Sequence, residues 1–400
     1  MKIAVFHNLP SGGAKRALHG FVRYLVASGH AVDVFIPSTA DESFLPLRGL
    51  ANNVEIFPVR NTLKGLVLST LRYLPPVRCS RADLEWTERD IARKINGGGY
   101  GVVLVEQDQF TMSPFILKYL KGPAIYFCQQ PSRLGEALEE RLPGQSEGQR
   151  RGPRWARALR RGYVAARINR MDANNAAFGS YILVNSCFSR ETVLRAYGLN
   201  SFVCYLGVDT QTFRPLPLPN GEYVLSVGAC TRLKGYDFLI RALGRVRATV
   251  RPRLVVVSNV VDRPWRGHLE RLAAQHGVAL EVKTLPSDAE LVQIYNGAKL
   301  FVYAPYLEPF GLAVLEAMAC GTVVVAVKEG GVRESVSHDE TGFLTERDEG
   351  MFAETVTGLL SDEARRRVMG EHAIRAVREF WTLEHAGDRL FHHIRRVVGG

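Results

Sequence analysis

The chain has 400 residues, of which 46% are apolar and 23% charged, as in globular proteins with two or three domains. No apolar run approaches the roughly 18 residues of a membrane-spanning helix. Six scattered cysteines without a Cys-x-x-Cys pair argue against a disulfide framework and against a thiolate metal site. The net charge of +11 favours an anionic partner: a phosphorylated substrate, a lipid surface or nucleic acid.

The first apolar segment, residues 2–7, is too short for the core of a secretory signal. We predict a buried strand there, and hence a cytoplasmic protein. The loop that follows contains Gly12 and Gly13 and leads into a helix, so its free N–H groups are suited to a phosphate or an acceptor. Lys15 and Arg16 occupy the first helical turn, where positive charge is unfavourable. Either an anion lies nearby or both side chains face solvent.

The rest of the chain alternates apolar strands with amphipathic helices, the pattern of an α/β fold with parallel sheets. Further strands are predicted at 31–37, 54–59, 102–106, 124–128, 181–185, 223–227, 254–258, 281–284 and 300–303. Helices are predicted at 14–28, over much of 60–97, at 236–250 and at 380–398. Prolines at 215, 217 and 219 indicate a linker between two domains, 1–212 and 213–379.

A strongly basic segment extends from Arg150 to Arg170, with eight arginines and no acidic residue. A helix beginning at Pro153 would place Trp155 and Tyr163 on one face and most arginines opposite, as in helices at a membrane surface. Peripheral membrane contact through 150–170 is one interpretation. A helix packed in the first domain with a solvated basic face is the other.

Two glutamates flank a strand–loop–helix turn in the second half of the chain. Glu308 lies in the loop after a buried strand, and Glu316 lies one turn into the next helix. That helix begins near Leu312, directly after Phe310 and Gly311, and the N–H groups at its start are available to an anion. Gly311 also frees the backbone for a close approach to a ligand. Since ligands of parallel sheets bind at this end and carboxylates accept hydrogen bonds from hydroxyls, the combination indicates a nucleotide-sugar site.

Two cations occupy the loop after the strand at 223–227. Arg232 and Lys234 are placed there to neutralise a diphosphate.

Four motifs follow one another from residue 308 to residue 344: Glu308-x7-Glu316, Ala317-Met-Ala-Cys-Gly321, Gly330-Gly331-Val-Arg-Glu334 and Thr341-Gly342-Phe343-Leu344. This run resembles family 4 of the retaining glycosyltransferases, the group 1 glycosyltransferases. The resemblance implies the GT-B fold, in which two Rossmann-like domains face each other across a cleft. It further implies an acceptor domain at 1–212, a nucleotide-sugar domain at 213–379, and a C-terminal helix, 380–400, that returns to the first domain.

The same resemblance implies the roles of the site residues. Glu308 contacts the hydroxyls of the donor sugar, and Glu316 contacts those of the ribose. Lys234, with Arg232, stabilises the departing diphosphate.

Two loops complete the predicted donor site. They are Gly12–Gly13 in the first domain and Phe310, Gly311 and Leu312 in the second, and the N–H groups of Gly13, Gly311 and Leu312 assist the two cations. The predicted reaction is retaining transfer of a hexosyl group, such as mannosyl or glucosyl, from a UDP- or GDP-sugar to a hydroxyl of a glycan or lipid-linked acceptor.

No metal cofactor is expected, since the chain contains no Asp-x-Asp sequence that would bind one beside a diphosphate.

Two positions depart from the family pattern. Gln129 stands where family members often have a histidine facing the sugar, four residues before Arg133, and both are predicted to contact the acceptor or the sugar. Ala229 stands where an arginine usually follows Gly228. A nucleotide-sugar-binding protein without transfer activity is therefore an alternative. Nucleic-acid binding is not expected, since no groove-reading or base-stacking motif is present.

Overall fold

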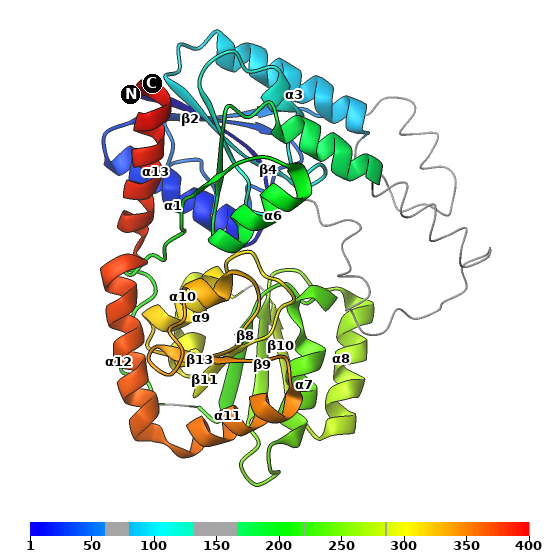
Figure 1. The fold of residues 1–400 in the computed structure, drawn as a ribbon, viewed down its shortest axis with the longest axis vertical. Helices are drawn as coiled ribbons and strands as arrows, with labels where there is room; N and C mark the ends of the chain where they lie inside the picture. Colours follow the sequence, from blue (N-terminus) through cyan, green and yellow to red (C-terminus); the bar gives the residue numbers. More distant parts are fainter. Residues whose placement is uncertain (61–79, 132–165, 220, 285, 400) are drawn as a thin grey trace, which may run out of the picture.

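Two parallel sheets form the framework of the residues that the structure describes. The structure, a computed structural model, describes residues 1–60, 80–131, 166–219, 221–284 and 286–399. Within them, the first sheet has seven strands in the order β3-β2-β1-β4-β5-β6-β7, and the second has six in the order β10-β9-β8-β11-β12-β13. Helices cover both faces of each sheet (Figure 1). The result is two Rossmann-like domains, as predicted.

The strands are β1 (Lys2–Asn8), β2 (Ala31–Pro37), β3 (Asn53–Phe57), β4 (Val102–Asp108), β5 (Ala124–Phe127), β6 (Tyr181–Val184), β7 (Phe202–Val203), β8 (Tyr223–Val227), β9 (Arg253–Ser258), β10 (Leu280–Thr284), β11 (Leu300–Tyr303), β12 (Val324–Val327) and β13 (Gly342–Thr345). The helices are α1 (Gly13–Ala27), α3 (Arg81–Asn96), α6 (Cys187–Tyr197), α7 (Tyr236–Arg245), α8 (Arg263–His276), α9 (Asp288–Asn296), α10 (Leu312–Ala319), α11 (Glu349–Ser361), α12 (Glu363–Phe380) and α13 (Leu383–Gly399). Short 3-10 turns are η1 (Phe115–Lys118), η2 (Arg232–Lys234) and η3 (Gly330–Glu334).

The central strands are almost entirely buried because helices cover them on both sides. β4, β11 and β12 are buried along their whole length. Helix α1 places its apolar residues against the first sheet, with Leu18, Phe21, Val22 and Leu25 buried. The predicted strands are therefore confirmed, with ends that shift by one or two residues.

The strand order reverses direction beside β1 in the first sheet and beside β8 in the second, so both have a topological switch point at a central strand. Loops that follow such strands are where α/β sheets bind ligands. The Gly12–Gly13 loop follows β1, and the Lys234 loop follows β8. The predicted domain boundary, 212–213, falls between β7 and β8.

The predicted C-terminal helix, 380–398, is confirmed as α13 with a start three residues later, and a separate helix, α12, ends just before it. Helix α12 ends at Phe380, and α13 begins at Leu383. Between them, backbone hydrogen bonds join Trp381 and Leu383 to Val208 at 2.8 and 2.9 Å. A Cβ at Gly207 would lie only 2.1 Å from the carbonyl oxygen of Thr382, so the glycine permits this close crossing. Helix α13 then lies beside α1 in the first domain (Figure 1).

Helix α7 is shorter than the predicted 236–250 and ends at Arg245. The guanidinium of Arg251 donates to the carbonyl oxygens of Gly244 and Val246 at 2.8 and 3.0 Å. Because a side chain satisfies these terminal carbonyl groups, the helix can stop without a glycine cap.

Several predictions fall on residues outside the described ranges. They are Arg133, residues 61–79 of the predicted helical region, and residues 150–165 of the basic segment. The described remainder of that segment belongs to a helix over 166–176. In the part of the chain that the structure describes, no helix has the length and apolar character to cross a membrane. Four of the five described cysteines are buried.

Candidate functional site

A cavity of about 650 Å³ lies where the carboxyl ends of the two sheets meet. The first domain contributes the Gly12–Gly13 loop and three residues of the loop after β2. The second contributes Lys234, Glu308, Glu316 and the start of α10. Residues that the sequence analysis assigned to one site, although separated by some 300 positions, thus line one cavity.

The loop that carries Glu308 is held in place by the Gly330–Gly331 pair. A Cβ at Gly330 would lie 2.2 Å from the carbonyl oxygen of Glu308, and one at Gly331 would lie 2.1 Å from that of Pro309. The N–H group of Gly331 donates to Glu308 at 2.8 Å. Only glycine allows the two backbones to approach so closely, so this motif positions Glu308 without itself facing the cavity.

Lys234 and Glu308 form an ion pair inside the cavity. The ammonium nitrogen Nζ of Lys234 lies 2.7 Å from Oε2 of Glu308, and each side chain is 22% exposed. Lys234 comes from η2 after β8, and Glu308 from the loop after β11. The pair brings the predicted diphosphate cation and the predicted sugar-binding carboxylate into direct contact, with both open to a ligand.

Glu316 is buried at the other side of the cavity and is bound by residues of both domains. Its Oε2 accepts a hydrogen bond of 2.7 Å from Tyr295, and its Oε1 lies 3.3 Å from Nε of Arg16. Burial raises the pKa of Glu316, while the charge of Arg16 and the Tyr295 hydroxyl oppose that shift. Arg16 also makes a two-pronged contact with Asp288 at 2.6 and 2.9 Å. One guanidinium thus joins the first domain to two carboxylates of the second.

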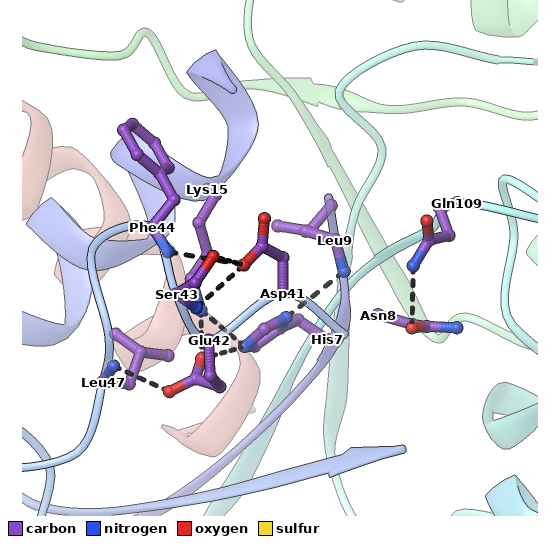
Figure 2. Close-up of polar contacts among 10 residues, drawn as sticks. All are labelled: His7, Asn8, Leu9, Lys15, Asp41, Glu42, Ser43, Phe44, Leu47 and Gln109. Atoms are coloured by element: carbon purple, nitrogen blue, oxygen red, sulfur yellow. Dashed lines mark hydrogen bonds and ion pairs between the residues drawn. The ribbon is translucent and has the colours of Figure 1, made fainter. Parts of the chain in front are cut away.

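Lys15, the other cation in the first turn of α1, does not line the cavity and pairs with residues of the first domain. Its side chain has 0% exposure, its Nζ lies 3.1 Å from Nε2 of His7, and it donates to the carboxylate of Glu42 (Figure 2). Burial raises the pKa of Glu42, but the contacts with His7 and Lys15 outweigh it and lower the value to about 2. Lys15 and Arg16 therefore do have anionic partners, which are carboxylates of the protein.

We expect His7 to make the protein less stable in mild acid. Burial lowers the pKa of His7 from 6.5 to about 4, so the unfolded chain binds one more proton across this window. The free energy of unfolding is thus undiminished above pH 6.5 and falls by about 3 kcal/mol as the pH drops to the folded value. Denaturant titrations of wild type and His7→Gln between pH 7 and pH 5 measure this.

The His7→Gln variant should show a flatter decline of stability with acid. His392→Gln, at an exposed histidine of α13, is the control and should decline as the wild type does. Equal slopes for all three proteins would show that His7 titrates normally.

Glu334, in the family-like Gly-Gly-Val-Arg-Glu motif, joins the two domains at a second place. Its oxygens accept hydrogen bonds from the backbone N–H groups of Cys187 and Phe188 at 2.8 and 2.9 Å. These groups begin α6 of the first domain, where a carboxylate is favoured by the helix dipole. Nearby, the hydroxyl of Ser186 donates to the carbonyl oxygen of Pro309 at 2.6 Å. The loop of Glu308 is therefore held against the first domain.

Four of the predicted site residues, Arg232, Phe310, Gly311 and Gln129, are not among those that line the cavity. The guanidinium of Arg232 lies 5.0 Å from the ring centroid of Trp265. Phe310 is buried and packs against aromatic rings, those of Tyr205 and Trp381, which anchors its loop. The structure shows these packing contacts, and direct contact of the two residues with a donor stays a prediction.

Gly311 lies just behind the cavity wall, at the N-cap of α10. Its φ of 93° is left-handed, the conformation that favours glycine, and its carbonyl oxygen accepts a hydrogen bond of 2.9 Å from the N–H of Val314. A Cβ at this position would lie 3.3 Å from the ring of Tyr303. The side of Gly311 where a Cβ would stand thus faces Tyr303, and the turn presents the next residue, Leu312, to the cavity. A close approach of Gly311 to a ligand stays a prediction.

Gln129 is engaged by the protein itself. It is 6% exposed, and its amide donates to the carboxylate of Glu106 at 3.3 Å. Its amide oxygen accepts a hydrogen bond of 3.0 Å from Asn185. Burial raises the pKa of Glu106 to about 8. Contact of Gln129 with an acceptor or sugar therefore remains a prediction.

Other residues of the cavity were not identified from the sequence. Tyr303 and Asn259 line it from the second domain, and Asp41, Ser43 and Phe44 line it from the first. The amide of Asn259 donates to the hydroxyl of Ser11 at 3.1 Å, across the two domains. The sequence does place Asp41 in a polar loop directly after a buried strand, a position where ligand-binding residues of α/β proteins commonly lie.

Among the described residues, no three His, Cys, Asp or Glu side chains lie together as candidate ligands of a metal ion.

Comparisons with known proteins identify the second domain. Residues 208–376 match a family model described as glycosyl transferases group 1. A D-inositol 3-phosphate glycosyltransferase of Stackebrandtia nassauensis is 36% identical over 207 residues, which are 46% of this chain and 46% of that protein. One of Mycobacterium tuberculosis is 32% identical over 238 residues, 54% of this chain and 49% of that protein. The matched part thus spans about half the length of these curated relatives.

Solved structures match over the whole chain at low identity. HepE of Anabaena, solved with UDP and glucose, has a TM-score of 0.73 at 18% identity and covers 99% of this chain and 100% of its own. Sucrose-phosphate synthase of Thermosynechococcus elongatus has a TM-score of 0.73 at 19% identity and covers 100% of this chain and 99% of its own. The predicted GT-B arrangement is therefore confirmed: the protein has the GT-B fold, and its residues 208–376 match the group 1 glycosyltransferase model.

Proposed function

We propose that the protein is a retaining glycosyltransferase that moves a hexosyl group from a UDP- or GDP-sugar to a hydroxyl of a glycan or lipid-linked acceptor. The observation that carries this proposal is the convergence of Lys234, Glu308 and Glu316 on one cavity between the two sheets. The relatives named above as glycosyltransferases, and the UDP and glucose bound to HepE, are consistent with it.

Each of the three side chains is assigned to a different chemical part of a nucleotide sugar. Glu316 accepts hydrogen bonds from the ribose hydroxyls, and Glu308 accepts them from the sugar hydroxyls. Lys234, 2.7 Å from Glu308, stands where a diphosphate would follow the sugar. The N–H groups at Gly13 and at the start of α10 are additional donors to its oxygens.

Transfer exchanges one glycosidic bond for another. The bond between the anomeric carbon and the diphosphate oxygen breaks, and a bond between that carbon and the acceptor oxygen forms on the same face. The departing diphosphate keeps the electron pair of the broken bond and takes the acceptor proton, so no protein base is required. Lys234 stabilises the negative charge that develops on this leaving group.

A thermal-shift screen with UDP, GDP, ADP and their sugars, each with and without EDTA, tests the donor site. Stabilisation by one nucleotide, unaffected by EDTA, is the expected result and identifies the base. Loss of the shift in EDTA would overturn the proposed metal independence. No shift with any nucleotide would overturn the donor site itself. An NMR spectrum of the product with that donor then checks for retention at the anomeric carbon.

A nucleotide-sugar-binding protein without transfer activity is the second candidate. It is favoured by Ala229, which lines the cavity where the family pattern has an arginine, and by the engaged amide of Gln129. Release of nucleoside diphosphate from the donor that binds, in the presence of acceptors, separates the two functions. Peripheral membrane contact through residues 150–170 remains part of the proposal.

A further inference from the structure

The loop after β2 forms one wall of the cavity. None of its residues has been assigned a contact with the donor. Three residues of this loop, Asp41, Ser43 and Phe44, line the same cavity as Glu308 and Lys234. They come from the first domain, whereas the groups assigned to the donor sugar and its diphosphate cation come from the second. A substrate that met this wall would approach the sugar from the opposite domain.

Hydrogen bonds within its own loop fix one carboxylate oxygen of Asp41. Its Oδ1 accepts hydrogen bonds from the N–H and hydroxyl of Ser43 at 2.8 and 2.7 Å and from the N–H of Phe44 at 3.3 Å. Figure 2 shows the other oxygen pointing away from these donors. Burial raises the pKa of Asp41, but these hydrogen bonds, together with one from the backbone of Ser11, outweigh it and lower the pKa, so the side chain is negatively charged at neutral pH.

The neighbouring residue, Glu42, holds the loop from behind. One oxygen contacts Lys15, and the other accepts a hydrogen bond of 3.0 Å from the N–H of Leu47. Because Lys15 is fully buried in α1, the loop is tied to the same helix that carries the Gly12–Gly13 turn. The positions of Asp41 and Phe44 in the cavity are therefore set by packing before any ligand binds.

Phe44, an aromatic residue of the same loop, also lines the cavity. The guanidinium of Arg16 lies 5.5 Å from the ring centroid and makes its ion pairs with Asp288 and Glu316. A fixed carboxylate accepts hydrogen bonds from hydroxyls, and an aromatic ring packs against the C–H face of a saturated ring. The same carboxylate repels a phosphate group at this wall.

We propose that Asp41 and Phe44 form the acceptor subsite and that it selects an uncharged polyhydroxylated ring, such as a glycosyl unit, over a phosphorylated one. This inference rests on the proposed glycosyl transfer and adds the class of acceptor. The remaining carboxylate oxygen of Asp41 accepts a hydrogen bond from an acceptor hydroxyl, and Phe44 covers the apolar face of the acceptor ring.

The test compares matched acceptors with the donor that binds. Methyl hexosides and myo-inositol are assayed against their monophosphates, through the acceptor-dependent release of nucleoside diphosphate. We expect at least one uncharged compound to be preferred over its phosphate by about tenfold or more in kcat/KM. Asp41→Asn should lower kcat/KM for that compound by about tenfold and reduce the preference. Phe44→Leu should raise its KM.

Arg48→Ala, an exposed change in the same loop, is the matched control and should behave as wild type. Calorimetric affinity for the nucleotide should be unchanged in all variants. A preference for the phosphates, wild-type kinetics in Asp41→Asn, or no stimulation by either set while nucleotide still binds would overturn the acceptor proposal. Failure of the wild type to bind any nucleotide would instead overturn the proposed function.

Discussion

Replacing Lys234 by alanine is expected to lower kcat for glycosyl transfer by about a hundred- to a thousandfold. The reason is electrostatic: in the proposed transfer the leaving diphosphate gains negative charge in the transition state, and Lys234, which lines the cavity between the two domains, is proposed to stabilise that charge. The ammonium group is held 2.7 Å from Glu308, so its position is set before the donor binds. Single-turnover assays with the preferred donor measure the effect on chemistry apart from product release.

Lys299→Ala is the matched control for this experiment. Lys299 precedes β11, at the opposite end of the strand from the cavity, and its partner is the exposed Glu222. Removing it takes away the same charge from the same domain and should leave kcat within about twofold. If Lys234→Ala transfers at the wild-type rate, the diphosphate is stabilised by other groups, and the assignment of Lys234 fails.

The variant Glu316→Gln is expected to bind the nucleotide about ten- to a hundredfold more weakly. Glutamine has the same shape and can still accept the hydrogen bond from Tyr295, which is 2.7 Å in the native protein. It loses the negative charge and one acceptor oxygen, and with them the proposed contact with the ribose hydroxyls. Isothermal titration with the nucleoside diphosphate, which lacks the sugar, isolates this loss from any effect at Glu308.

The contacts of Arg16 make the melting temperature of Glu316→Gln a useful second measurement. In Glu316→Gln its guanidinium keeps both contacts with Asp288, so the link between the domains should survive. The melting temperature therefore separates a folding defect from a binding defect. Glu340→Gln, at an exposed glutamate of the same domain, is the control. Wild-type affinity in Glu316→Gln would mean that the ribose is held elsewhere.

The ends of the helices show where local sequence stops being sufficient. Helix α9 begins at Asp288 because Ser287 and Glu290 form a capping box within four residues. Helix α7 stops early because Arg251 reaches back to its last carbonyl groups. The break between α12 and α13 requires Val208, some 170 residues away along the chain. Neither of these last two contacts has a local sequence pattern.

The site divides in the same way. Glu308, Lys234 and Glu316 were identified from the sequence because a strand–loop–helix unit fixes which residues lie at the ligand end of a sheet. For Lys15 and Arg16, the sequence left open whether an anion lies nearby or both side chains face solvent. Tertiary structure provides Glu42 for the first and Asp288 with Glu316 for the second.

Gly311 shows the same limit within a single loop. The sequence correctly indicates a glycine that the backbone requires at the start of α10, and its φ of 93° bears this out. The side of this glycine where a Cβ would stand faces the ring of Tyr303, at the end of β11. A need for glycine can be inferred locally, but the group that approaches it depends on packing.

By itself, then, the sequence determined the two parallel sheets and the residues at their carboxyl ends, because strand burial and βα turns depend on a few neighbouring positions. Only the tertiary structure decided which of those residues share a cavity. It placed the guanidinium of Arg232 over the ring of Trp265, and it joined Gln129 to Glu106 by a hydrogen bond. It also brought the loop of Asp41 and Phe44 into the cavity that Lys234 and Glu308 line. These outcomes depend on how two domains pack and on which buried charge finds which partner, and such long-range pairings leave no periodic pattern in the chain.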